Sequence, residues 1–217
     1  MRPQRKRRMA INVDGYIIHL DKVLGKGRFS RVFEALSPHG EPKAAKIFRS
    51  QWVEDAKEEL ENLILIKSNS TNCPNLVTYD TVLQTDKFKS PIIIMPLLGP
   101  SLLKILGWRY DFRDMGQSET TMGLPRWLSA QIIRDSLNGI CQLHDVGLIH
   151  SDLKPENILI DRPITSAEEL MQAPEFNFVV VDVGSSMLMI DAQGNNHGTS
   201  GYRAPELVTQ QPSFDES

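Results

Sequence analysis

The segment from Leu148 to Leu159 places three chemically complementary side chains close together. Asp152 offers a carboxylate that can accept a proton, Lys154 offers an ammonium group, and Asn157 offers an amide oxygen. Transfer of a phosphoryl group needs an acceptor for the proton of the attacking hydroxyl, a cation for the moving phosphate and a ligand for a metal ion. The alternative is a turn with coincidental charges. The combination of residue types favours phosphoryl-transfer chemistry.

Three other segments carry groups suited to the same chemistry. Gly25-Lys26-Gly27 lies between two expected strands, where glycines let backbone amides approach phosphate oxygens. Taken alone, the segment reads better as a plain hairpin turn. Its position between two strands, with a later strand that carries Lys46, strengthens the phosphate-binding interpretation. Asp182 ends the short apolar strand 178–181. Neither a Walker loop nor a Rossmann fingerprint is present in the sequence, since the lysine-serine ending and the following helix are both absent.

The periodicity of apolar residues predicts an α+β fold. A small sheet with one amphipathic helix is expected first, with strands and helix at 16–24, 31–35, 44–48, 53–67 (the helix), 76–83 and 91–95. A mainly helical part follows, with a short helix at 101–107 and a long one at 127–146. The long helix is expected to bury one face, made of Leu128, Ile132, Leu137, Ile140 and Leu143. Residues 109–125 are predicted to be an exposed polar insertion, and 161–177 a second insertion.

Composition excludes several classes of protein. The 217 residues are 41% hydrophobic and 24% charged, which is typical of a globular protein. Apolar runs are too short to cross a bilayer, so no membrane association is expected. Two cysteines, Cys73 and Cys141, allow neither a disulfide framework nor a cysteine-based metal cluster, and an intracellular location fits best. Five basic residues among the first eight predict a disordered tail over 1–12, which is either simply solvated or attracts nucleic acid and directs the chain to the nucleus.

Four motifs in the same order resemble those of eukaryotic protein kinases. They are the glycine-rich segment 25–32, the segment 148–159, Asp182-Val183-Gly184, and Gly198 to Glu206 with its Ala204-Pro205-Glu206 ending. The glycine segment, Glu59 to Leu63, and Gly184-Ser185-Ser186 are most similar to the CMGC group and its pre-mRNA-processing kinases. The resemblance implies a bilobal kinase-like domain over 13–217, with a sheet lobe at 13–98 and an incomplete helical lobe at 99–217.

The resemblance also implies a serine/threonine kinase that uses ATP and Mg²⁺ and acts on a protein substrate. Catalysis would fall to Asp152, Lys154, Lys46 and Glu59, with Glu58 and Glu61 as competitors for the place of Glu59. Asn157 and Asp182 would bind the metal. Thr199 would contact the catalytic segment, while His150 would be structural. The implied ATP-binding residues are Gly25, Lys26, Gly27, Val32, Ala44, Lys46, Met95, Leu97, Leu98 and Leu159.

Two departures from the kinase pattern qualify these expectations. Ser151 replaces the arginine that pairs with an activation-loop phosphate, so phosphorylation at 185–200 is not expected to act through that contact. The chain ends shortly after Glu206, so the helical lobe is expected to be a fragment or to be completed by a partner. A kinase-like module that binds nucleotide or partners without turnover is therefore the alternative function. The cellular location is expected to be nuclear or cytoplasmic, leaning toward nuclear.

Overall fold

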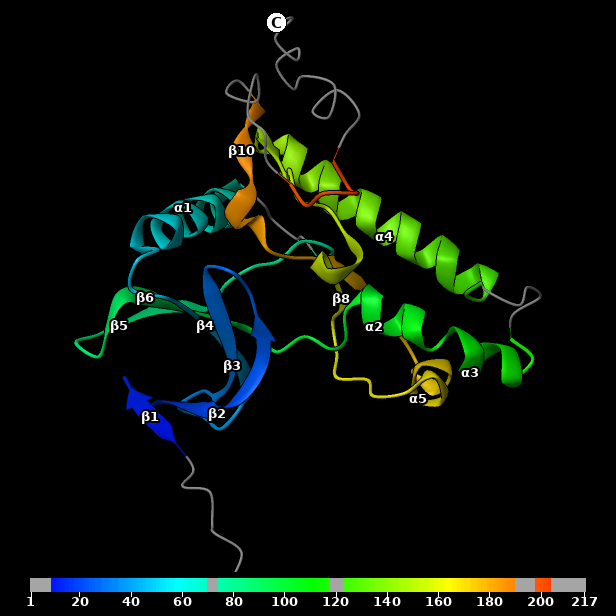
Figure 1. Ribbon diagram of the computed structural model, residues 1–217, viewed down its shortest axis with the longest axis horizontal. Helices are drawn as coiled ribbons and strands as arrows, with labels where there is room; N and C mark the ends of the chain where they lie inside the picture. The colour runs from blue at the N-terminus through cyan, green and yellow to red at the C-terminus, as the bar shows by residue number, and fades with distance from the viewer. Residues whose placement is uncertain (1–8, 70–73, 118–122, 190–197, 204–217) are drawn as a thin grey trace, which may run out of the picture. The chain divides into compact units, whose positions relative to one another are not determined.

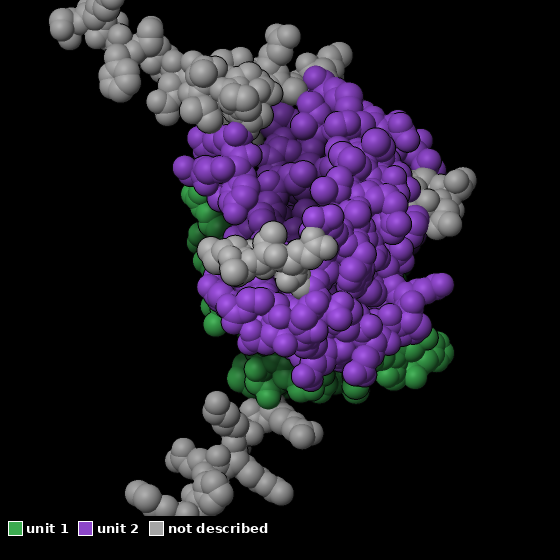
Figure 2. All heavy atoms as spheres, turned by 90° about the vertical axis from the view of Figure 1, so that its right-hand side faces the viewer, with its two compact units in different colours: residues 1–61, 78–97 green, residues 62–77, 98–217 purple. Residues whose placement is uncertain are grey.

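A computed structural model describes residues 9–69, 74–117, 123–189 and 198–203. The chain divides into two compact units, coloured separately in Figure 2. The first unit comprises residues 1–61 and 78–97, and the second comprises residues 62–77 and 98–217.

The first unit is built on a strongly curled antiparallel sheet (Figure 1). The strand order is β1-β2-β3-β4-β6-β5. The strands are β1 Ala10–Val13, β2 Tyr16–Lys26, β3 Ser30–Leu36, β4 Pro42–Phe48, β5 Thr81–Thr85 and β6 Phe88–Pro96. Alternate residues such as Phe33, Ala35, Ala45 and Ile47 form a buried cluster on one face of the sheet. The sequence therefore predicted the sheet correctly, because alternation of side chains is the main signal of a half-buried strand.

Two details of this unit differ from the sequence prediction. Residues 10–12, expected in the disordered tail, belong to β1 and pair with β2 in register. The strand expected at 76–83 begins only at Thr81. Leu76 forms a single parallel bridge with Val180 in the second unit instead. Both ends of 76–83 carry buried apolar residues, Leu76 and Leu83, so the sequence reads as one strand although only the part from Thr81 onward belongs to the sheet.

Helix α1, Val53–Asn69, contributes residues to both units. Ala56, Glu59, Leu63 and Ile66 are all buried and recur every three or four residues. This spacing places them on one face of the helix. Glu59 is the acidic residue of that face.

The second unit is mainly helical (Figure 1). Its elements are α2 Leu102–Gly107, α3 Arg109–Asp114, α4 Arg126–Asp145, β7 Leu148–Ile149, η1 Pro155–Asn157, β8 Ile158–Ile160, α5 Ala167–Gln172, β9 Phe178–Val180, η2 Val183–Ser185 and β10 Met187–Leu188. Two short antiparallel strand pairs, β7 with β10 and β8 with β9, flank the segments that contain Asp152, Asn157 and Asp182. No helix in the described parts of the chain is long and apolar enough to cross a membrane.

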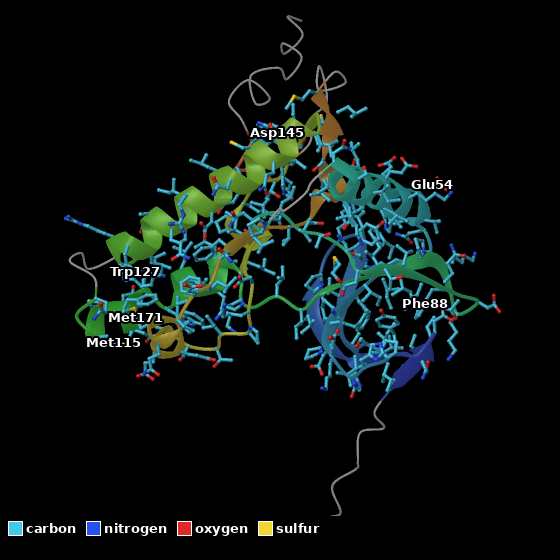
Figure 3. All side chains as sticks on the ribbon, turned by 180° about the vertical axis from the view of Figure 1, so that it is seen from behind. Glu54, Phe88, Met115, Trp127, Asp145 and Met171 are labelled. Atoms are coloured by element: carbon cyan, nitrogen blue, oxygen red, sulfur yellow. The ribbon has the colours of Figure 1, made fainter. Side chains whose placement is uncertain are left out.

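The two expected insertions contribute to the core of this unit. Segment 109–125 was predicted to be exposed, but it contains α3, whose Phe112 is fully buried. Segment 161–177 contains α5, whose Leu170 packs in the same cluster with Phe112 and Phe176. Figure 3 labels Met171 on α5, which packs against this cluster, and Trp127 at the start of α4, which is 42% exposed. A few isolated large apolar residues were enough to anchor segments that look polar on average.

Helix α4 buries most of the predicted face, with Leu137 as the exception. Leu128 and Leu143 are buried as expected, but Leu137 is 58% exposed, and Asp135 and Gly139 occupy the buried face instead. Asp135 accepts a hydrogen bond from the backbone N–H of Phe178 at 3.1 Å, and the Asn75 amide donates to the carbonyl of Phe178 at 2.9 Å. The start of β9 is thus held by two buried polar side chains. Their burial is stable because they are hydrogen-bonded.

Gly139 is expected to be essential for this close packing. A Cβ at this position would lie 2.3 Å from the carbonyl oxygen of Asn75 and 3.0 Å from Val180 Cγ2. We expect Gly139→Ala to lower the free energy of unfolding by about 1–3 kcal/mol, because overpacking outweighs the better helix propensity of alanine. Urea denaturation measures the change. Gly107→Ala is the control, since a Cβ on Gly107 meets nothing within 4 Å; an equal loss in both variants would contradict the packing argument.

Candidate active site

The first unit places Lys46 and Glu59 in direct contact. Lys46, on β4, lies with its Nζ 2.6 Å from both carboxylate oxygens of Glu59, on α1. Both side chains are buried, with 7% and 4% of their residue surface exposed. Glu58 and Glu61, the two alternatives considered from the sequence, are exposed. A bidentate carboxylate holds the ammonium group in one position, which is useful where a cation must meet a phosphate.

The sheet register places four of the expected nucleotide-binding residues of this unit on one face. Val32 lies opposite Lys46, and Ala44 lies opposite Met95. Residues opposite each other in an antiparallel pair share a face, as do residues two apart on one strand. Val32, Ala44, Lys46 and Met95 therefore share the face opposite the cluster that contains Phe33 and Ile47.

The glycine-rich segment forms the turn between β2 and β3. The N–H of Gly27 donates to the carbonyl of Ser30 at 3.0 Å, and Gly25 pairs with Val32. Lys26 ends β2. Leu97 follows β6 as the last residue of this unit, whereas Leu98 and the β8 residue Leu159 belong to the second unit.

In the second unit, Asp152 is the centre of a hydrogen-bonded cluster. Its Oδ1 accepts from the Thr199 hydroxyl at 2.6 Å and from the Thr199 N–H at 2.8 Å. Its Oδ2 lies 2.6 Å from Lys154 Nζ, which also donates to the Thr199 hydroxyl at 2.7 Å. The predicted contact of Thr199 with the catalytic segment is confirmed. These contacts orient Asp152 and Lys154 together.

The electrostatics of this cluster favour an ionised Asp152. Burial alone would raise the pKa of the carboxyl group, but hydrogen bonds from Lys154 and Thr199 outweigh burial and lower the pKa below 3.8. At neutral pH the group is therefore a carboxylate. A carboxylate with a lowered pKa is a weak base, so it is better suited to orienting a hydroxyl than to removing its proton early in a reaction.

Asn157 and Asp182 lie at the same end of the antiparallel β8–β9 pair. The carbonyl of Asn157 accepts from the N–H of Val181, next to Asp182. The Asn157 amide nitrogen donates to the carbonyl of Asp152 at 2.9 Å, which leaves its amide oxygen as the atom suited to a cation. Asp182 has left-handed backbone geometry, with φ 65° and ψ 60°. Such a conformation is uncommon outside glycine and is a feature of functional turns.

These two side chains fit a magnesium ion rather than a transition metal. Mg²⁺ is usually bound by one or two protein oxygen ligands together with substrate phosphates and water. No cluster of three or more His, Cys, Asp or Glu residues that could hold a metal ion occurs among the residues the structure describes. A magnesium ion held by one carboxylate and one amide oxygen, together with phosphates and water, does not need such a cluster. The side chains of Asp182 and Asn157 therefore agree with Mg²⁺.

Asn62 is a site residue that the sequence analysis missed. Its amide donates to the carbonyls of Val183 at 3.0 Å and Ser186 at 3.2 Å, and so holds the turn η2 that follows Asp182. Val183, which stands where the kinase pattern has phenylalanine, is fully buried in this turn. The available signal was a polar residue three positions after Glu59, close to the apolar face of α1. This position alone does not identify a partner more than a hundred residues away.

His150 links the catalytic segment to the strand before Asp182. Its Nε2 lies 2.9 Å from the carbonyl of Val181, and its Nδ1 accepts from the N–H of Asp152 at 3.3 Å. A neutral ring with the proton on Nε2 satisfies both contacts. Burial is the main cause that lowers the pKa of His150 below 6.5, which favours the same neutral form. The expectation of a structural role fits these contacts.

The neutral state of His150 predicts a pH dependence of stability. Because the folded pKa lies below the unfolded value, protons bind more strongly to the unfolded chain as the pH falls through 6.5. The stabilisation is complete above pH 6.5 and is lost on acidification toward the folded pKa, by at most about 1.4 kcal/mol per pH unit. Denaturation curves between pH 7.5 and 5.5 measure the loss, and His150→Gln should reduce it. His144→Gln, on the exposed end of α4, should leave it unchanged; the reverse pattern would contradict the assignment.

The end of the last motif of the kinase resemblance lies outside the described part of the chain. The motif Ala204-Pro205-Glu206 falls in 204–217, so its expected role is not addressed by the structure. Ser151 is described, and its backbone is left-handed with φ 63°. The carbonyl of Ser151 lies against Gly198, where a Cβ would approach to 2.6 Å. Glycine at 198 therefore allows Thr199 to reach Asp152.

Comparison with known proteins agrees with these features. A crystal structure of the kinase domain of PF14_0431 is similar with a TM-score of 0.72, at 24% identity, over 94% of this chain and 60% of that chain. This similarity confirms the α+β kinase fold. The chain is 28% identical over 218 residues to the dual specificity protein kinase KNS1 of Saccharomyces cerevisiae, covering 86% of this chain and 27% of KNS1.

Two further relatives are a second dual specificity kinase and a calcium/calmodulin-dependent kinase. A probable dual specificity protein kinase YAK1 homolog of Encephalitozoon cuniculi is 30% identical over 189 residues, covering 86% of this chain and 41% of the relative. The calcium/calmodulin-dependent protein kinase type 1 of Caenorhabditis elegans is 28% identical over 193 residues, covering 88% of this chain and 49% of the relative. The chain thus spans about a quarter to a half of the length of these curated relatives. The family model described as protein kinase domain matches residues 18–217, so this chain belongs to the protein kinase domain family.

Proposed function

We propose that this protein transfers the γ-phosphoryl group of ATP to serine or threonine hydroxyls of a protein substrate, and that residues 13–217 form its kinase domain. The observation that carries the proposal is the cluster of Asp152, Lys154 and Thr199, joined by hydrogen bonds of 2.6 to 2.8 Å. Its groups match the needs of phosphoryl transfer, in which catalysis is mostly positioning and charge stabilisation.

In the proposed reaction, Asp152 accepts a hydrogen bond from the substrate hydroxyl. This bond directs the hydroxyl oxygen of the substrate toward the γ-phosphorus of ATP. A new O–P bond forms while the bond between the γ-phosphorus and the β–γ bridging oxygen breaks, and ADP leaves. Asp152 takes the hydroxyl proton late, when the attacking oxygen has become acidic, which suits a carboxylate of lowered pKa. Lys154 neutralises charge on the transferring group.

The other assigned residues bind the nucleotide. Lys46, held by Glu59, is assigned to the α- and β-phosphates. Asn157 and Asp182 are assigned to Mg²⁺, which when bound neutralises phosphate charge. Val32, Ala44 and Met95, which share a face with Lys46, are assigned to the nucleotide together with Gly25, Lys26, Gly27, Leu97, Leu98 and Leu159. The basic residues before Met9 support a nuclear location, which fluorescence microscopy of the tagged protein can test.

Transfer of ³²P from labelled ATP to a general acceptor such as casein tests the proposal. We expect Mg²⁺-dependent transfer to serine or threonine, and a loss of about 10²–10⁴-fold in Asp152→Asn. Phosphoamino-acid analysis identifies the acceptor; phosphotyrosine as the main product would contradict the serine/threonine assignment.

The same experiment decides between the kinase and a binding module without turnover. If neither the wild-type protein nor Asp152→Asn transfers phosphate while Mg-ATP still raises the melting temperature of the wild type, a nucleotide-binding module without turnover is favoured. If Mg-ATP produces no thermal shift, nucleotide binding itself is contradicted.

A further inference from the structure

The first unit contains a basic concavity that is lined by none of the residues assigned to the reaction. It has a volume of about 580 Å³ and opens where β4 leaves the sheet, beside the turn between β5 and β6. Its floor includes Phe33, Ile47 and Phe88, which belong to or pack against the apolar cluster of the sheet. Figure 3 labels Phe88 at this end of the sheet.

The rim of the concavity is positively charged. Arg31, Arg49, Lys87 and Lys89 line it, and none of the lining residues, all of which the structure describes, is acidic. Arg49 donates to the carbonyl of Gly27 at 3.2 Å. In the described part of the chain, Arg31, Lys87 and Lys89 form no ion pair and are exposed, so their charge is available to a ligand.

The combination of floor and rim defines the chemistry of the occupant. An apolar floor stabilises a bulky apolar side chain by removing it from water, and a basic rim attracts carboxylates around it. Phe33 and Phe48 are 7% and 5% exposed, so Phe88, which is partly exposed, is the one aromatic lining residue whose ring could meet a nucleic-acid base. Binding of single-stranded nucleic acid uses several aromatic rings on which successive bases stack. The concavity therefore fits a peptide better than single-stranded nucleic acid.

We propose that this concavity, defined by Arg31, Phe33, Ile47, Lys87, Phe88 and Lys89, is a docking site for an acidic peptide segment of a partner protein, anchored by one large apolar side chain. The segment would place an aromatic or leucine side chain on the floor and its aspartates or glutamates against the rim. Recognition of this kind concentrates most of the binding energy in the anchor and leaves specificity to the charges.

Residues that line the concavity also contact the glycine-rich segment and lie close to Lys46. Arg31 lies on β3 directly after the glycine turn, and Arg49 contacts Gly27. Phe48, which also lines the concavity, has Lys46 Nζ 5.3 Å from its ring centroid. Binding can nevertheless be measured without nucleotide, so the docking proposal stands independently of the proposed kinase activity.

Fluorescence anisotropy tests the proposal on the whole chain without ATP. The probe is a fluorescein-labelled peptide with one phenylalanine between glutamates, and two matched peptides replace that phenylalanine with alanine or the glutamates with lysines. We expect saturable binding of the first peptide only, with an affinity that falls as salt rises. Equal binding of the alanine peptide would overturn the role of the apolar floor, and absence of binding at millimolar protein would overturn the site.

Surface substitutions locate the binding. Lys87→Gln with Lys89→Gln should weaken binding about five- to tenfold, since each exposed ion pair contributes modestly. Lys57→Gln with Lys104→Gln is the control with the same change in charge at exposed positions outside the concavity. Similar weakening in both double variants would overturn the location.

The basic residues before Met9 provide the main competing explanation, since they too attract acidic peptides. A variant with Arg2, Arg5, Lys6, Arg7 and Arg8 changed to glutamine should keep binding that depends on the phenylalanine. Loss of that binding in the tail variant alone would overturn the proposal. A labelled single-stranded RNA that competes equally well with the peptide would assign the surface to nucleic acid instead.

Discussion

Breaking the Lys46–Glu59 pair is expected to produce separate losses of stability and activity. Glu59→Leu should lower the free energy of unfolding by about 3–5 kcal/mol, because it removes the carboxylate from a buried ammonium group. Lys46→Met should have a similar cost. The double variant Lys46→Met with Glu59→Leu should recover most of the stability, because two apolar side chains of similar volume replace two buried charges. Chemical denaturation of all four proteins measures the coupling.

Activity should not follow stability in this series. If Lys46 binds the phosphates, phosphoryl transfer should fall by about 10²–10³-fold in every variant that lacks it, including the stable double variant. A purely structural ion pair would instead regain activity together with stability in the double variant. Glu58→Leu is the matched control on the same helix; because Glu58 is exposed, its stability and transfer should change little.

Asp182→Asn is expected to reduce phosphoryl transfer by about 10³-fold with little change in melting temperature. Asparagine has the size of aspartate and tolerates the left-handed backbone at this position, so the turn should be kept. The substitution removes the negative charge that Mg²⁺ prefers in a ligand, and metal stabilisation of the transition state is worth several kcal/mol. Initial rates over a Mg²⁺ titration measure the effect.

A readout independent of turnover makes this prediction specific. The thermal shift produced by Mg-ATP should shrink in Asp182→Asn, whereas Asp145→Asn, an exposed carboxylate at the end of α4 (Figure 3), should keep both the shift and the rate. Asp182→Ala should additionally lose about 1–2 kcal/mol of stability, because alanine does not favour left-handed geometry. Wild-type rates in Asp182→Asn would remove Asp182 from the metal site.

The sequence alone was sufficient to predict the type of fold and the family, because both depend on local pattern. Alternating apolar residues predicted the sheet, and helical spacing predicted α1 and α4. The contact between Thr199 and the catalytic segment followed from the resemblance to protein kinases. The choice of Glu59 over its neighbours was also open to a sequence argument, since only Glu59 shares the buried face of α1 with Ala56 and Leu63.

Tertiary structure decided the features that depend on partners distant in the sequence. Asn62 holds the turn after Asp182, and Asp135 and Asn75 hold the start of β9, although each reads as an ordinary polar residue. Phe112 and Leu170 bury segments that look polar on average. A hydrogen bond or a packing contact between residues far apart leaves no periodic signal, because only folding brings its two ends together.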